Sequence, residues 1–239
     1  MSTQIDPLTI AADLLYAVKT EGAADELRNR LATLDRDRLQ RALSGRQARL
    51  AFWLNCYNAY TQLLIEDDPS PLEGGVLDRW KFFARDRIPI AGIWLSLDDI
   101  EHGLLRGSKH PWGFGYLPRP FASSFERRFR LEDVDPRIHF TLSRGSESCP
   151  PLAVYSAVDC DEELDVATEW YLAENLTYDP DRNVVTVPPL FRWYRGDFGG
   201  TRGIRSFLRE YGAIPQDVSP TLEYDESDWT VDVDDHPDG

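Results

Sequence analysis

The segment that most constrains the fold is residues 46–65, where apolar side chains fall on most sides of the helix that the pattern predicts. Such a helix has to be covered by other elements in nearly every direction, so it belongs at the centre of the molecule. We expect it to end before Asp67-Asp68-Pro69. Its two polar exceptions, Asn55 and Asn58, lie about one turn apart and therefore share one face.

The remaining segments can supply that cover within one domain. The chain has 239 residues, and single cores grow to about 250–300 residues before a chain divides. We predict an α+β fold, helical in its first third, with a small and mainly antiparallel sheet. The globular domain is expected over residues 1–218, and an acidic, mobile tail over residues 219–239.

Local patterns place the individual elements. Capping residues, proline and glycine mark where each helix begins and ends, and alternation of apolar residues marks the strands. The expected elements are two helices within 8–32 that meet near Glu21-Gly22, a helix from about Asp35, a hairpin over 86–95 that turns at Ala91-Gly92, a helix opened by the capping box Ser96–Asp99, a strand over Ile138–Leu142, a helix from about Asp161 to Glu174, a strand from Val184 to Val187 and a helix from about Gly203 to Tyr211.

The net charge of the chain disfavours two classes of binding partner. The sequence has 41 acidic and 26 basic residues, a net charge of −15, and such a surface repels phosphate backbones and anionic lipids. We therefore expect no nucleic-acid or membrane partner, and we read the acidity as a halophilic adaptation to a cytosol of high salt. No export signal or membrane span is found, and three cysteines cannot all pair, so a cytoplasmic protein is expected.

Cys149 is the residue whose surroundings point to chemistry. It follows the small-residue turn of residues 145–148 and precedes Pro150, and proline favours the first position of a helix. A thiol at a helix N-terminus is stabilised as the thiolate, the form that acts as a nucleophile or metal ligand. Two histidines are candidate partners, His139 on the predicted strand and His102, which follows Glu101. Cys56 lies inside the apolar helix and is expected to be a buried hydrophobe.

The sequence lacks the common motifs that bind nucleotide cofactors or a catalytic zinc ion. The sequence has no Gly-x-Gly-x-x-Gly, no Walker sequence and no His-Glu-x-x-His, so we expect no cofactor. Residues 107–121 form a loop rich in glycine, proline and aromatic residues, among them Trp112. This loop is expected to act as a lid or to pack over the core, with Trp112 as a candidate substrate contact.

Five sequence stretches together resemble one known family, catalogued as domain of unknown function 547. They are Ala51–Ala59, Leu95–Arg106, Asp135–Phe140, Ser148–Leu152 and Phe191–Phe198, in the order typical of that family. The resemblance covers about residues 30–210. It implies motif positions at Asn55, Tyr57, Asn58, Glu101, His102, His139, Cys149, Arg195 and Asp197. It also implies a likeness to permuted papain-like or transglutaminase-like folds, in which histidine precedes cysteine.

The sequence departs from the family's pattern at two places. Cys56 replaces a usual apolar residue, and Ser143-Arg144 stands where the family has Asn-Cys before the glycine. The second departure removes a neighbouring thiol and so disfavours dithiol chemistry.

Three functions remain open on these residues. The first is a thiol-dependent hydrolase or acyltransferase acting on an amide or ester of a small-molecule or peptide-like substrate. In it Cys149 is the nucleophile, His139 or His102 the base, and Glu101, Asn55 or Asn58 the orienting or oxyanion-stabilising group; Tyr57, Trp112, Arg195 and Asp197 are the expected substrate contacts. The second is a non-catalytic binding or scaffold domain, with its protein partner left open. The third is a metal site made by His102, His139, Cys149 and Glu101.

Overall fold

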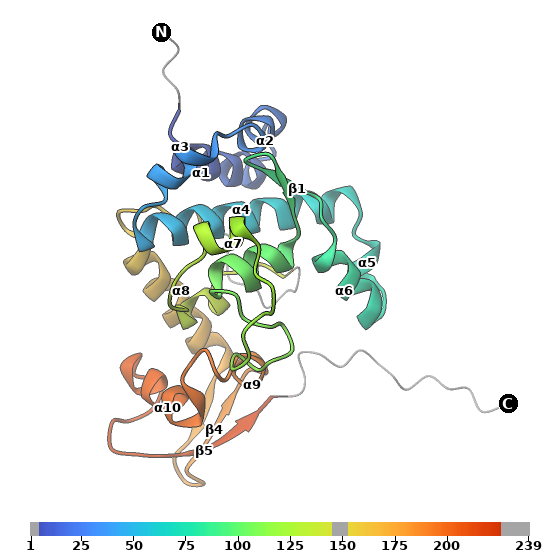
Figure 1. Ribbon diagram of the computed structural model, residues 1–239. Helices are drawn as coiled ribbons and strands as arrows, with labels where there is room; N and C mark the ends of the chain where they lie inside the picture. The colour runs from blue at the N-terminus through green and yellow to red at the C-terminus, as the bar shows by residue number, and fades with distance from the viewer. Residues whose placement is uncertain (1–4, 145–152, 226–239) are drawn as a thin grey trace, which may run out of the picture.

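Helix α4 (Arg46–Asp67) crosses the middle of the molecule (Figure 1), as its all-round apolar character predicts. The computed structural model describes residues 5–144 and 153–225. Every residue of α4 from Leu50 to Thr61 is buried. The elements that cover it are α1 (Pro7–Lys19), the π-helix η1 (Asp99–Leu105) and α8 (Cys160–Asn175).

The first third of the chain is helical, as predicted. α2 (Asp25–Ala32) and α3 (Arg36–Ala42) follow α1, and α5 (Ser70–Glu73) and α6 (Val76–Ala84) follow α4. Local signals set these boundaries: the Asp35 carboxylate accepts a hydrogen bond from the backbone N–H of Arg38 and caps α3.

The predicted hairpin is also confirmed. β1 (Ile88–Ile90) pairs antiparallel with β2 (Ile93–Leu95), and the turn residues Ala91 and Gly92 both have positive φ. Two left-handed residues give the turn whose twist matches the strands it joins. Ser96 and Asp99 then form the expected capping box, each side chain accepting from the other's backbone N–H at 3.0 and 3.1 Å.

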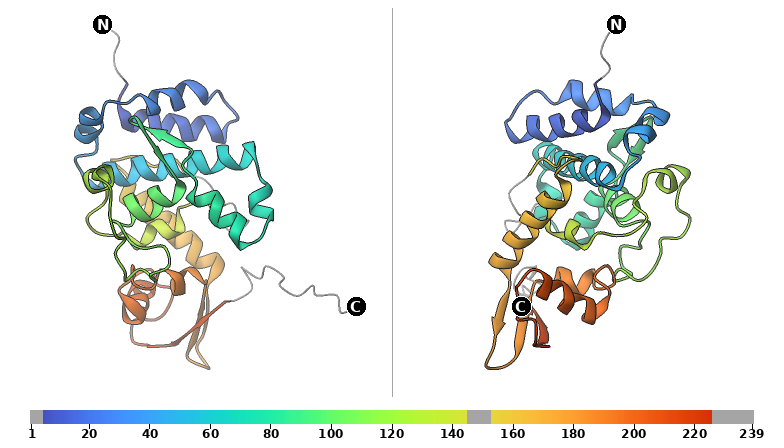
Figure 2. Two further views of the ribbon diagram at one scale, coloured as in Figure 1. Left: turned by 45° about the vertical axis from the view of Figure 1, so that its right-hand side comes forward. Right: turned by 90° about the vertical axis from the view of Figure 1, so that its left-hand side faces the viewer.

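A second, three-stranded sheet lies at the opposite end of the molecule (Figure 2). β3 (Thr177–Asp179) pairs antiparallel with β4 (Val184–Val187), and β4 pairs parallel with β5 (Thr221–Tyr224). α9 (Leu190–Trp193) and α10 (Gly200–Glu210) connect β4 to β5. The expectation of a mobile tail from residue 219 is therefore wrong for β5, which extends the sheet; residues 226–239 lie outside the described residues.

Two hydrophobic cores divide the interior. The first surrounds α4 and includes Ile138, whereas the second gathers around α8, α10 and the C-terminal sheet and includes Phe140. The segment between them is the 3₁₀-helix η2 (Pro136–Phe140), which comes after the short helix α7 (Ser124–Phe129).

The predicted strand over Ile138–Leu142 is thus wrong, and so is the sheet position expected for His139. Asp135 caps the segment through the N–H of Arg137, and Pro136 occupies the first turn, both typical of a helix start. With three residues per turn, successive side chains point in three directions. Ile138 and Phe140 enter different cores, and His139 lies buried between them.

The architecture is the α+β class expected from the sequence, with helices predominant and two small sheets. Among residues 5–144 and 153–225, each helix is too short or too polar to cross a lipid bilayer.

Candidate active site

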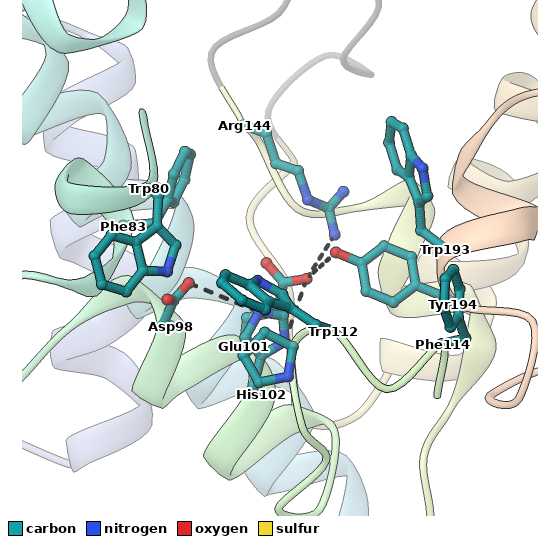
Figure 3. A pocket seen from close by; sticks show the side chains of 11 residues that line it. Trp80, Phe83, Asp98, Glu101, His102, Trp112, Phe114, Arg144, Trp193 and Tyr194 are labelled. Atoms are coloured by element: carbon teal, nitrogen blue, oxygen red, sulfur yellow. Dashed lines mark hydrogen bonds and ion pairs between the residues drawn. The ribbon is translucent and has the colours of Figure 1, made fainter. Parts of the chain in front are cut away.

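A pocket of about 400 Å³ opens between η1, α6, α9 and the loop of residues 107–121 (Figure 3). Acidic and basic groups lie at its floor, and aromatic rings form its walls. The lining residues are Trp80, Phe83, Asp98, Glu101, His102, Pro111, Trp112, Phe114, Arg144, Trp193 and Tyr194.

Glu101 is the buried anion at the floor. Its carboxylate accepts hydrogen bonds from the Tyr194 hydroxyl at 2.7 Å, the Arg144 guanidinium at 3.0 Å and the Tyr57 hydroxyl at 3.2 Å. Burial by itself raises the pKa of Glu101, but the charges of Arg144, His102 and Arg106 outweigh it and hold the pKa below its usual value. Glu101 is therefore ionised and fully engaged, so it cannot stabilise a second negative charge.

His102 is held in one tautomer. Arg106 has only donors, so its Nη1, 2.8 Å from His102 Nδ1, donates to that nitrogen and leaves the ring proton on Nε2. Nε2 lies 3.7 Å from an Asp98 oxygen. Burial lowers the pKa of His102 to about 4, against the opposing charge of Glu101, so the ring is neutral at pH 7.

Arg106 is brought to His102 by the wide turn of η1. The backbone N–H of Arg106 donates to the Glu101 carbonyl five residues back, the hydrogen bond of a π-helix. Its Nε donates to Asp197 at 2.6 Å, and both side chains are fully enclosed. The guanidinium carbon lies 4.6 Å from the centre of the Tyr194 ring.

His139 shares the same carboxylate. His139 Nε2 lies 3.0 Å from Asp197 Oδ2, while the buried Nδ1 has no hydrogen-bond partner in the described part of the chain. Burial lowers the pKa of His139 to about 4, although the contact with Asp197 acts to raise it. Asp197, whose pKa lies below its usual value because His139 and Arg106 outweigh its own burial, is ionised. The result is a neutral imidazole with its proton on Nε2 and a lone pair on Nδ1.

Tyr194 lies between the His139–Asp197 pair and the pocket. Its ring stacks on the His139 imidazole with centroids 3.9 Å apart and planes 17° from parallel. Its hydroxyl reaches Glu101 on the pocket floor. A ligand in the pocket is therefore one aromatic ring away from His139.

Two glycines allow the aromatic loop to meet the segment that carries Asp197. The Gly196 N–H donates to the Phe114 carbonyl at 2.7 Å. A Cβ on Gly196 would lie 2.5 Å from the Gly115 backbone, and one on Gly115 would lie 2.6 Å from the Asp197 nitrogen. Only glycine permits this approach, which sets both Phe114 and Asp197 in place.

Asn55 and Asn58 brace the chain on either side of residues 145–152. Asn58 donates to the Thr141 carbonyl at 3.0 Å and accepts from the Ser143 N–H at 2.9 Å. Asn55 makes the same pair of bonds with Tyr155, at 2.8 and 2.9 Å. Both amides are used by the backbone, so the structure gives no support to the oxyanion role expected for them.

The cysteines differ in what the structure describes. Cys149 lies outside the described residues, and the helix predicted to start there does not extend into residues 153–156, which are not helical; the next helix is α8, which begins at Cys160. Cys56 and Cys160 are buried free thiols, and burial raises the pKa of both, that of Cys160 to about 12. Neither is a nucleophile at neutral pH.

The four expected substrate contacts fall in three different places. Trp112 lines the pocket, whereas Tyr57 and Asp197 are buried beneath it. Arg195 is exposed, and its guanidinium lies 5.9 Å from the Tyr116 ring, away from the pocket lining.

Among the described residues no group of three His, Cys, Asp or Glu side chains is placed to hold a metal ion, and this includes Glu101, His102 and His139.

Sequence reasoning gave no functional role to Asp98, Arg106, Arg144 and Tyr194. Three of these stood inside motifs quoted for the family resemblance, and Arg144 was visible as a departure from that pattern. Arginine inside a run of apolar residues, as in Leu104-Leu105-Arg106, is a signal of a buried ion pair that could have marked one of them.

Comparison with known proteins gave one match. A family model described as "Protein of unknown function, DUF547" matches residues 40–172, more than half of the chain. Neither the curated proteins nor the solved structures gave a match, so the expected likeness to papain-like folds stays a prediction. The matched span holds Glu101, His102 and His139, and on this match the chain belongs to the DUF547 family.

Proposed function

We propose that this protein is a thiol-dependent hydrolase or acyltransferase acting on an amide or ester, with Cys149 as nucleophile, His139 as general base and Asp197 as the residue that orients the base. The observation that carries the proposal is the buried His139 Nδ1, which lacks a partner among the described residues while Nε2 is fixed on Asp197. A buried imidazole nitrogen without a partner is costly, and a thiol proton would satisfy it.

The same geometry favours His139 over His102 as the general base. Both nitrogens of His102 face other side chains, Nδ1 the Arg106 guanidinium and Nε2 the Asp98 carboxyl. His139 instead has one nitrogen bound to a carboxylate and one without a partner among the described residues. This is the arrangement of the base in a nucleophile–base–carboxylate triad.

The chain's connectivity supports a meeting of Cys149 and His139. Arg144 donates to the His139 carbonyl at 3.3 Å, and Cys149 follows five residues later. Five residues span at most about 18 Å. Asn55 and Asn58, one turn apart on α4, hold the chain on both sides of Cys149, so both anchors lie near one point.

In the proposed reaction the thiol proton moves to His139 Nδ1 as sulfur attacks the substrate carbonyl. The tetrahedral intermediate expels an amine or alcohol, which takes the proton back from His139, and a thioester remains on Cys149. Water, or a second amine or alcohol, then gives its proton to His139 as it attacks the thioester carbonyl. The C–S bond breaks, the acid or the transferred acyl product leaves, and the Cys149 sulfur takes the proton back from His139, which restores the thiol.

Alkylation kinetics test this proposal. Iodoacetamide should modify Cys149 at pH 6 at least about tenfold faster in the native protein than in His139→Gln or Asp197→Asn, because general-base assistance typically contributes 10²–10⁴-fold. His102→Gln serves as the control and should keep the native rate. The site of modification is mapped by peptide mass spectrometry, and folding is checked by circular dichroism.

A rate at Cys149 that is unchanged by both substitutions, or no greater than the rates at Cys56 and Cys160, would contradict the catalytic proposal. The buried ion pairs of this site would then be the organising centre of a binding or scaffold domain. Labelling that appears only after chelation would instead indicate a coordinated thiolate.

A further inference from the structure

The walls of the pocket expose far more aromatic surface than a closed core would. Trp112 is 73 % exposed, Phe114 52 %, Trp80 48 % and Trp193 36 %. Figure 3 shows these rings gathered around the acidic floor. Faces of aromatic rings carry partial negative charge and attract cations, most strongly in the case of tryptophan.

Asp98 adds a carboxyl without a cationic partner. Its side chain is 20 % exposed, and the one polar group at ion-pair distance among the described residues is His102 Nε2 at 3.7 Å. The neighbouring guanidinium groups bind other carboxylates, Arg119 to Asp99 at 2.8 Å and Arg144 to Glu101 at 3.0 Å. The pocket thus combines a half-buried carboxyl group that has no cationic partner among the described residues with rings that favour cations.

We infer that this pocket binds a protonated primary amine of the lysine type, with its ammonium group against Asp98 and its carbon chain between the aromatic rings. The pocket volume of about 400 Å³ lies within the range of small-ligand sites. The inference deepens the proposed function and rests on it in one respect: because Tyr194 both lines the pocket and stacks on His139, the amine is assigned to the amide or ester substrate.

Titration of Asp98 gives the binding a pH dependence. Burial, and then the charges of Glu101 and Asp99, raise the pKa of Asp98 to about 7 against the opposing effect of Arg119. The other groups that face it are His102 and, from α4, Tyr57. His102 stays neutral and Glu101 stays ionised between pH 6 and 8, and a lysine-type amine stays protonated. Amine binding should therefore strengthen as Asp98 loses its proton.

The test measures binding to the Cys149→Ser protein, which cannot turn over an acyl substrate. The two probes are Nα-acetyl-lysine amide and Nα-acetyl-norleucine amide, which share a linear side chain and differ by the ammonium group. Calorimetry, with tryptophan fluorescence as a second readout, should show the lysine probe binding at least about tenfold more tightly at pH 8. That affinity should fall about tenfold at pH 6, because most of Asp98 is then protonated.

Variants separate charge from packing. Asp98→Asn should make the two probes bind equally, whereas Asp13→Asn, an exposed position on α1, should leave the lysine preference intact. Trp112→Ala should weaken both probes. Equal binding of the probes to the parent protein, no binding of either, or a lysine preference that survives Asp98→Asn would overturn the inference. Because no step of the assay uses the thiol, a failure of the His139 alkylation test leaves these outcomes readable.

Discussion

Asp98 and Glu101 are two carboxyl groups of one helical turn, and their surroundings drive their pKa values apart. Glu101 receives two tyrosine hydroxyls and a guanidinium, so it stays ionised. Asp98 has no such donors among residues 5–144 and 153–225, and burial raises its pKa to about 7. Divergent titration of neighbouring acids recurs at sites that bind charge or transfer protons.

A stability measurement on Asp98→Asn follows from that pKa. Asp98 binds its proton more tightly in the folded state than in the unfolded chain, so its contribution is complete below about pH 4 and is lost as pH rises through 7. The variant should exceed the native protein in free energy of unfolding by about 2–4 kcal/mol at pH 8, and match it near pH 4. Urea denaturation at both pH values checks this. A native protein more stable than the variant at pH 8 would show that Asp98 has a cationic partner.

The element that positions His139, the proposed base, is η2, and one arginine holds this element in place. Arg137 binds Asp135 at its own helix start, and Asp161 and Asp165 on α8, all at 2.8 Å. Asp135 is almost completely buried, so the pairing fixes η2 against α8. His139 follows two residues later, and its direction toward Asp197 depends on this attachment.

Removing that arginine should therefore affect both stability and chemistry. Arg137→Ala leaves the buried Asp135 carboxylate with the half-exposed Arg46 as its one guanidinium partner among the described residues, and should cost about 2–4 kcal/mol of unfolding free energy. Arg46→Ala is the matched control, because its side chain is 40 % exposed and should cost less than about 1 kcal/mol. Thermal and urea unfolding compare the two variants. A loss below about 1 kcal/mol for Arg137→Ala as well would show that η2 is held by packing rather than by this ion pair.

Elements whose signals are local were predictable, and those set by tertiary contacts were not. The Ser96–Asp99 capping box, the Ala91-Gly92 turn and the apolar periodicity of α4 act over a few residues. The segment Ile138–Leu142 has the alternation of apolar residues typical of a strand, but it is buried on several sides between two cores. No local sequence pattern reveals burial of this kind. In the site, motif positions identified His139 and Glu101. The pairing of His139 with Asp197 spans 58 residues of sequence and needed the fold.

Over the whole molecule, the net charge of −15 is the dominant electrostatic property. Within the site, each arginine is matched by a carboxylate, as in Arg106–Asp197 and Arg144–Glu101. Apart from Asp98, the excess negative charge therefore resides elsewhere, where carboxylates repel one another across solvent. We propose on this ground that the fold is adapted to high salt.

Salt titration tests that proposal. The Debye length falls from about 10 Å at 0.1 M to about 3 Å at 1 M salt, so self-repulsion should weaken and the thermal midpoint should rise with KCl. Sucrose at matched osmolality controls for excluded-volume effects. A midpoint that stays flat or falls from 0.1 to 2 M KCl would remove the argument for halophilic adaptation.

Asp197 also determines the stage of protein synthesis at which the site can form. It is the carboxylate for both Arg106 and His139, yet it follows them in the chain by 91 and 58 residues. Chains emerge from the ribosome N-terminus first. On a growing polypeptide the imidazole of His139 therefore lacks the group that orients it until the C-terminal core is made and docks across Gly115 and Gly196. On the function proposed above, a nascent or truncated chain that ends before Asp197 would carry Cys149 as an ordinary thiol, and its reactivity would be delayed until Asp197 has been made and docked.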